Sequence, residues 1–110
     1  KVDEGSDPKD EVISEPEANP RLDAPRLSSH PNPSPGQSEV HFTLPRSEQV
    51  TLQVYDLKGE RVATLYDASA SANAETKVDW QADDLPNGLY FIRLTTDSGK
   101  SVTTRVMLQR

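Results

Sequence analysis

Apolar and polar residues alternate along most of the chain beyond residue 26, which predicts a series of short β-strands. The alternation is clearest at 40–44, 50–55, 76–80, 89–95 and 101–109. A period of two places successive side chains on opposite faces of a sheet. Each run therefore has one face suited to a core and one face suited to water.

A hairpin is expected between the second of these runs and the residues that follow it. The segment 56–60 contains Gly59 where a tight turn needs a positive φ, and residues 61–66 would form the return strand. Val62 and Leu65 are out of phase in that strand, which predicts a β-bulge between them.

Turn residues and one edge strand complete the expected domain. The small, polar stretch 67–74 is expected to be a loop, 83–88 and 97–99 are expected to be turns, and 26–30 a short edge strand. Six or seven antiparallel strands, with turns about every 8–12 residues, indicate an all-β, Ig-like antiparallel β-sandwich without a helix. The side chains expected in its core are Val40, Phe42, Leu44, Val50, Leu52, Val54, Leu57, Val62, Leu65, Val78, Trp80, Leu85, Tyr90, Ile92, Leu94, Val102, Val106 and Leu108.

The residues ahead of the sandwich have a different composition. Seven of the nine prolines lie at or before Pro35, the first 26 residues are rich in acids, and they contain no aromatic side chain. Such a segment does not bury enough apolar surface to offset its chain entropy. We therefore divide the chain into a disordered acidic linker, residues 1–26, and a sandwich domain, residues 27–110.

Charge and composition exclude several classes of function. A net charge of −6 argues against a nucleic-acid partner, and the absence of cysteine rules out disulfides and thiolate chemistry. No apolar run is long enough for direct membrane insertion. The chain starts at Lys1 without a signal peptide, so we expect it to be part of a longer precursor.

The sequence offers little catalytic chemistry. His30 and His41 are the only histidines, and each is better explained as a solvated side chain than as a catalytic base. Two histidines without cysteine also make a poor zinc site. Asp79, Asp83 and Asp84 would suit Ca²⁺, but turn formation and solubility explain these acids better. We expect no enzyme activity and no cofactor.

Two features stand out from this background. The segment Pro31–Gly36 contains three prolines, which lack backbone N–H donors. It can therefore lie along a sheet edge without offering that edge to another strand, and this is compatible with a role in recognition. On the strand 89–95, Leu89 and Phe91 point away from the core. If that strand neighbours the last one, they form an apolar strip with Met107, beside Arg105. The strip is either a docking surface or covered by a loop of the same domain.

Four motifs occur in a fixed order: Pro31-Asn-Pro with Gly36, the hairpin 50–59, Leu85-Pro-Asn-Gly-Leu-Tyr90, and Arg105-Val-Met-Leu-Gln-Arg110. Together they resemble the type A C-terminal sorting domain of cargo proteins of the Bacteroidetes type IX secretion system. The resemblance covers about Leu27 to Arg110, nearly all of the expected sandwich. One departure is that arginine stands at both ends of the final motif, where lysine is common.

The resemblance implies that the domain is a C-terminal sorting signal that directs a larger cargo protein across the outer membrane. A cargo domain upstream in the same precursor would enter the periplasm. The outer-membrane translocon and its shuttle protein would then recognise the sorting domain, and a sortase would cut it off near the linker at the cell surface. The alternative is a structural Ig-like spacer or assembly module of a secreted or cell-envelope protein, retained in the mature chain.

The resemblance also implies two sets of site residues. The residues expected to meet the translocon or the sortase are Pro31, Pro33, Gly36, Gly88, Leu89, Tyr90, Phe91, Arg105, Met107 and Arg110. The region expected to be cleaved comprises Ala24, Pro25, Arg26, Leu27, Ser28 and Ser29.

Overall fold

The computed structural model describes residues 24–110, and these residues form seven β-strands and no helix. Most of the expected linker, residues 1–23, lies outside the described part of the chain. The strands are β1 (Arg26–His30), β2 (Gln37–Thr43), β3 (Glu48–Tyr55), β4 (Arg61–Ala70), β5 (Thr76–Gln81), β6 (Gly88–Thr96) and β7 (Ser101–Leu108). The described residues also contain no helix that could span a membrane.

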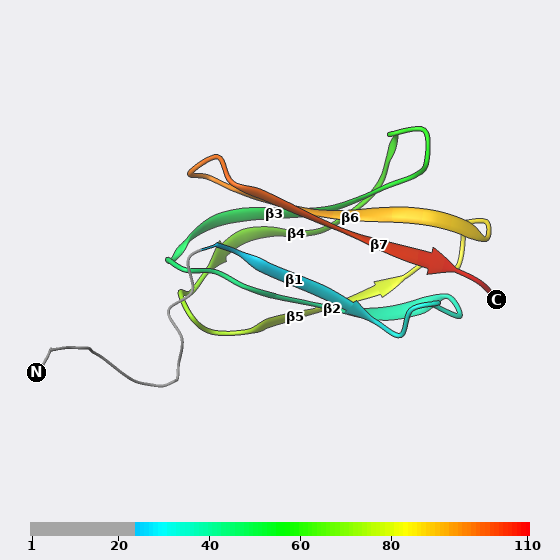
Figure 1. Cartoon of the computed structure of the whole chain (residues 1–110), viewed down its shortest axis with the longest axis horizontal. Coiled ribbons are helices and arrows are strands. Elements are labelled where there is room, and N and C mark those ends of the chain that lie inside the picture. The colour runs from blue at the N-terminus through cyan, green and yellow to red at the C-terminus, as the bar shows by residue number, and fades with distance from the viewer. Residues whose placement is uncertain (1–23) are drawn as a thin grey trace, which may run out of the picture.

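The strands form two antiparallel sheets that face each other. One sheet has three strands in the order β1-β2-β5, and the other has four in the order β4-β3-β6-β7. Figure 1 shows the two layers. The edge strands β1 of one sheet and β7 of the other lie along the same side of the sandwich. This arrangement confirms the all-β, Ig-like sandwich expected from the alternation of residues.

The core lies between the sheets, where the inward faces of the strands meet. Burial alternates along β2 and β3 as the sequence pattern predicts. The fully buried side chains expected from the sequence are Val40, Phe42, Leu44, Val50, Leu52, Val54, Trp80, Tyr90, Ile92, Leu94, Val106 and Leu108, and the small residues Ala70 and Ala82 join them. The prediction that Leu57 belongs to the core is wrong. Leu57 is 72% exposed because it lies in the β3–β4 turn, which projects beyond the sandwich.

The β3–β4 hairpin has the predicted turn and a more irregular return strand. Gly59 adopts φ +86°, as the turn requires. The β3–β4 register shifts twice, once skipping Leu65 and once skipping Val62. The expected bulge is therefore confirmed, but it takes the form of two irregularities, one at each out-of-phase residue.

The segment 67–74 was expected to be a loop, and its first four residues instead extend β4. Glu48 and Gln49 continue β3 backwards and pair with Ala70 and Ser69. Ala70 is buried as a result. Small residues have a low intrinsic tendency to form strands, but cross-strand pairing overrides that tendency here.

Candidate recognition surface

Three of the sequence motifs meet at the end of the sandwich where β7 finishes (Figure 1). We call this cluster of segments 31–36, 82–90 and 105–110, without the outward-facing side chains of Leu89, Arg105 and Met107, the terminal junction. Its residues are far apart in the sequence, and hydrogen bonds join the segments. The junction contains most of the residues expected to be recognised.

The proline-rich segment caps the free edge of β7. The Asn32 side chain donates to the Arg105 carbonyl over 3.2 Å and accepts from the Met107 N–H over 2.9 Å. The Ser34 N–H donates to the Met107 carbonyl, and the Gln109 N–H donates to the Ser34 carbonyl, over 2.6 and 2.7 Å. The predicted edge cap is confirmed, and these contacts occupy backbone groups that another strand would otherwise pair with.

Arg110 is bound inside the junction. Its guanidinium donates to the carbonyls of Leu85, over 2.7 Å, and Ala82, and its N–H donates to the Asn87 side chain over 3.2 Å. Gly36 lies directly beneath it with φ +123°, where an added Cβ would lie 3.2 Å from the Arg110 Nε. The positive φ favours glycine at this position, and a larger residue would also require the Arg110 side chain to shift by a few tenths of an ångström.

The hydroxyl and the ring of Tyr90 each contact another residue of the domain. It is only 4% exposed, and its hydroxyl donates to the Pro86 carbonyl over 2.7 Å. Its ring meets the Trp80 ring edge to face, with centroids 5.9 Å apart. A tyrosine near the start of this strand that bonds back to the preceding turn is the tyrosine corner of Ig-like folds.

The apolar strip lies on the outer face of β6 and β7. These strands are neighbours, Leu89 is opposite Met107, and Phe91 is opposite Arg105. Leu89 and Phe91 are half-buried, Arg105 is exposed and Met107 is 40% exposed. Side chains directly opposite each other in an antiparallel pair lie close together. The strip predicted from the sequence is therefore continuous and faces outward.

A groove adjoins the strip at Phe91. Its volume is about 290 Å³, and it is lined by Tyr55, Asp56, Leu57, Gly59, Phe91, Arg93 and Thr103. The β3–β4 turn forms one wall of the groove, so it flanks the strip at Phe91. Leu89 and Met107 lie outside the groove, and Met107 is 40% exposed.

The other expected recognition residues lie around the same end. Pro31 and Pro33 are exposed, and their peptide bonds to His30 and Asn32 are cis. Gly88 is half-buried and begins β6. The polar residues Asn32 and Asn87 were not among the residues expected from the sequence, although both side chains hold the junction together.

The expected cleavage region lies mainly in β1. Ala24 is exposed and Pro25 is buried, while residues 26–29 pair with β2. Leu27 packs against the core. A protease that needs an extended, open segment would reach residues 26–29 only after β1 leaves the sheet.

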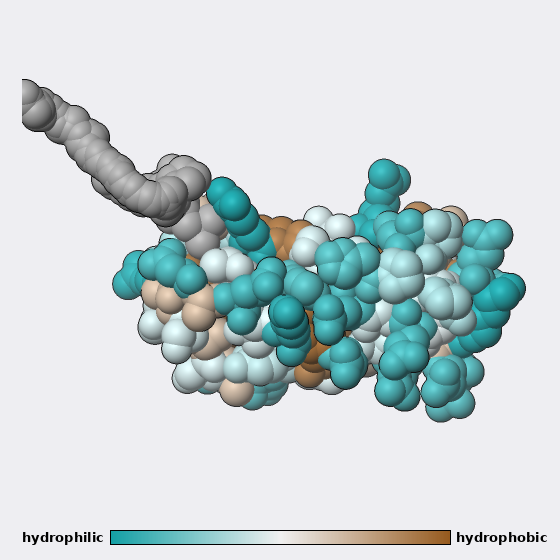
Figure 2. Space-filling view, turned by 90° about the horizontal axis from the view of Figure 1, so that it is seen from below, coloured by the Kyte–Doolittle hydropathy of each residue, from teal (hydrophilic) through white to brown (hydrophobic). Residues whose placement is uncertain are grey.

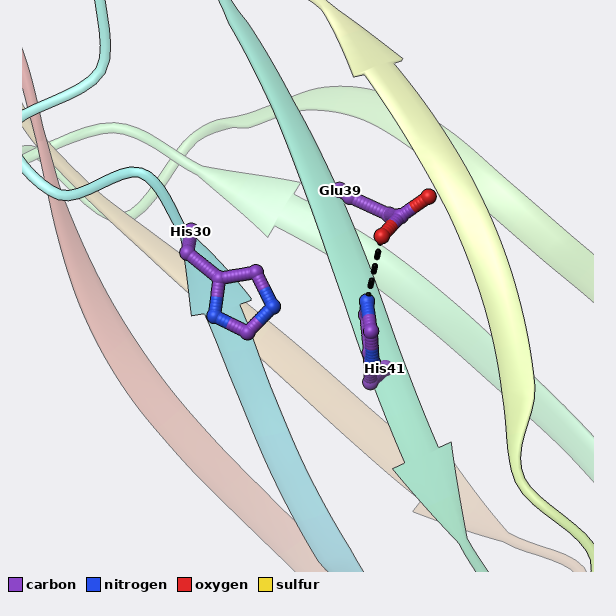
Figure 3. A group of neighbouring side chains, drawn as sticks. All are labelled: His30, Glu39 and His41. Carbon is purple, nitrogen blue, oxygen red and sulfur yellow. Dashed lines mark hydrogen bonds and ion pairs between the residues drawn. The ribbon is translucent and has the colours of Figure 1, made fainter.

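The two histidines, which sequence reasoning treated separately, lie together on the outer face of β1 and β2 (Figure 3). Their ring centroids are 4.7 Å apart. His41 contacts Glu39 through Nε2 over 2.7 Å and Glu75 through Nδ1 over 3.2 Å. The hydrogen bond between His41 and Glu39 raises the pKa of His41 and lowers that of Glu39, and Glu75 raises the pKa of His41 further. This cluster depends on strand register, which the sequence alone does not reveal.

The face that carries the histidines is mostly hydrophilic, as Figure 2 shows from the side of the three-stranded sheet. Asp79, Asp83 and Asp84 are exposed. Within residues 24–110 they do not form a group of three ligands, in contrast to His30, Glu39 and His41.

Comparison with known families gives one match. The family described as the secretion system C-terminal sorting domain matches residues 28–109. The match spans all seven strands except the first two residues of β1. None of the curated proteins compared with the chain matches it.

Proposed function

Because the chain belongs to the secretion system C-terminal sorting domain family, type A of the type IX system, we propose that the outer-membrane translocon and its shuttle protein bind its β6–β7 face. Domains of this family are sorting signals, and the proteins that carry them are secreted to the cell surface or the extracellular space. The family is not an enzyme family. The function therefore depends on surface shape and chemistry.

One observation carries this proposal: the terminal junction is closed by its own hydrogen bonds, while the strip beside it is apolar and faces outward. Leu89, Phe91 and Met107 form a surface that a receptor can bury, and Arg105 adds a positive charge at its edge. Apolar patches rimmed by polar groups are typical of protein-binding sites.

The precursor would pass through the periplasm with its cargo domain ahead of residue 24, and a sortase would cut within Ala24–Ser29. The strand that contains most of this region suits such a step. β1 has five residues, pairs with β2 along one edge only, and carries a single side chain that packs on the core, Leu27. It is therefore the strand that detaches most easily.

Fusion of the whole 110-residue chain to a periplasmic reporter tests the sorting role. In cells with a working type IX system we expect the reporter at the cell surface. Mass spectrometry should then show that the C-terminus of the exported reporter lies within residues 24–29. The same cells without the translocon are the control and should retain the reporter in the periplasm. Retention in the periplasm of both strains would favour the spacer alternative. Translocon-dependent export with the sandwich still attached would keep the sorting role and contradict cleavage within residues 24–29.

The substitution Phe91→Ser tests the strip. Because Phe91 is only half-buried, we expect it to cost less than about 2 kcal/mol of stability, against about 3–5 kcal/mol for a fully buried phenylalanine. Export should fall strongly. Thr95→Ala, on the same outer face but away from the strip, is the matched control and should be exported normally. A Phe91→Ser protein that is stable and exported normally would exclude the strip as the docking surface.

A further inference from the structure

His30, Glu39 and His41 point to the same side of the three-stranded sheet because of the strand register. His30 on β1 is directly opposite Glu39 on β2, and His41 follows Glu39 by two residues. Residues opposite each other, and residues two apart on one strand, share a face of the sheet. Figure 3 shows the three side chains gathered on that face.

The ligand atoms of this group are close enough for one ion. One nitrogen or oxygen atom from each side chain lies within 4.8 Å of the other two. Around a tetrahedral zinc ion, such atoms lie about 3.3 Å apart, since each sits about 2.0–2.2 Å from the metal. Rotation of the exposed His30 side chain and the half-buried Glu39 side chain covers the difference. We propose that His30, Glu39 and His41 bind a divalent metal ion of the zinc class.

The donor set selects the kind of metal. Two imidazoles and one carboxylate suit Zn²⁺, with Cu²⁺ and Ni²⁺ as chemical relatives, whereas Ca²⁺ and Mg²⁺ prefer an all-oxygen set. Three protein ligands leave the fourth position to water. Because His30 is exposed and Glu39 is half-buried, an ion enters from solvent without a change in the fold.

Glu75 supports the site from behind His41. Its carboxylate lies 3.2 Å from Nδ1, while Nε2 faces Glu39. A carboxylate that holds the proton on one ring nitrogen directs the lone pair of the other nitrogen toward the metal. Glu75 is therefore a positioning residue, and it fixes the tautomer of His41 that the metal requires.

The charges around the group favour a cation. On β5, Asp79 is opposite Glu39 and Lys77 is opposite His41. Glu39, Glu75 and Asp79 together outnumber the two positive charges on this face, Lys77 and Arg26. An added divalent ion reduces this excess of negative charge.

A metal at this position joins two strands. His30 is the last residue of β1, the edge strand, and the other two ligands belong to β2. The ion therefore holds β1 in the sheet. Slower detachment of the proposed cleavage region is a consequence that rests on the proposed function, whereas the binding experiments below do not.

Titration of the whole chain with Zn²⁺ tests the site directly. We expect one ion per chain by calorimetry, and a rise in Tm of roughly 10 °C or more when free Zn²⁺ is about a hundred times its Kd. EDTA should reverse the rise. Ca²⁺ at the same concentration should leave Tm unchanged, which separates the histidine site from the many acids of residues 1–23.

Single substitutions identify the ligands. His30→Gln and Glu39→Gln should each weaken Zn²⁺ binding by at least about tenfold, and Glu75→Gln by roughly tenfold. Glu60→Gln, an exposed glutamate in the β3–β4 turn of the other sheet, is the matched control and should bind as the parent does. His30 is exposed, so its variant should fold whatever the fate of a His41 variant. Binding that survives in His30→Gln, or no binding by the parent chain, overturns the proposal.

Hydrogen exchange tests the link between the strands. With Zn²⁺ bound, the β1 amides that bond to β2 should exchange more slowly than in the metal-free chain, and His30→Gln should abolish the effect. The β6 amides serve as an internal reference and should change less. Equal slowing in β1 and β6 would contradict a metal that bridges β1 to β2.

Discussion

The terminal junction and the apolar strip lie side by side on β6 and β7, yet they are built in opposite ways. In the junction, Asn32, Ser34 and Arg110 direct their hydrogen bonds to backbone groups of the same domain. In the strip, Leu89 and Met107 face each other with apolar surface open to solvent. The sequence motifs that mark the family therefore contain two kinds of residue, those that hold the fold and those that remain available to a partner.

The last strand shows this division most clearly, because the two kinds alternate along it. Val106 and Leu108 are fully buried, and Arg105 and Met107 face outward. Substitutions at the buried positions should consequently lower mainly stability, and substitutions at the outward-facing positions should lower mainly export.

The largest contrast is expected between Leu108→Ala and Met107→Ala. Leu108 has no exposed surface, so its truncation leaves a cavity and should cost about 2–5 kcal/mol of unfolding free energy. Met107→Ala should cost less than about 1 kcal/mol and should mainly reduce export. Urea denaturation measures the first effect and the surface reporter the second. Equal destabilisation by the two substitutions would remove the distinction between the faces of β7.

A smaller effect is expected from Asn32→Ala. The substitution removes two hydrogen bonds to β7, worth about 0.5–1.5 kcal/mol each, and should cost about 1–3 kcal/mol in total. Asn32→Asp keeps the acceptor for the Met107 N–H but loses the donor to Arg105, and should give an intermediate loss. Thermal denaturation of the three proteins checks the order. Unchanged stability in Asn32→Ala would mean that the side chain does not hold the edge.

The smallest difference in stability is expected between the alanine substitutions of the two arginines of the final motif, Arg105 and Arg110. From the sequence, replacing Arg105 and Arg110 together by alanine is expected to spare folding and to reduce sorting. The structure instead leads us to expect a loss of about 1 kcal/mol for Arg110→Ala, which removes the contacts to Leu85 and Ala82. Arg105→Ala should stay within about 0.5 kcal/mol of the parent while reducing export. If both variants melt alike, Arg110 does not anchor the tail.

The alternation of residues was sufficient to predict the fold, because strand burial has a period of two and the inner faces of β2, β3 and β6 are largely apolar. It failed where a residue's environment depends on shape. Leu57 has the chemistry of a core residue but lies in a turn that projects from the sandwich. Residues 67–70 have the composition of a loop, but they pair with the beginning of β3.

The site was predictable in part. The outward direction of Leu89 and Phe91 follows from strand periodicity, and the sequence order of the motifs indicated the family. The contacts of Asn32 and the meeting of His30 with Glu39 and His41 were not predictable. Asn32 and Met107 are 75 positions apart in the sequence, and the histidine group depends on the register between β1 and β2.

The course of β1 has a geometric consequence for the whole precursor. The strand begins at Arg26 near one end of the sandwich and leads toward the terminal junction at the other (Figure 1). Its five residues span about 17 Å, at about 3.3–3.4 Å each. The chain ahead of Arg26 therefore enters the sandwich at the opposite tip from the junction, which separates the point where an upstream domain is attached from the end where the family motifs meet.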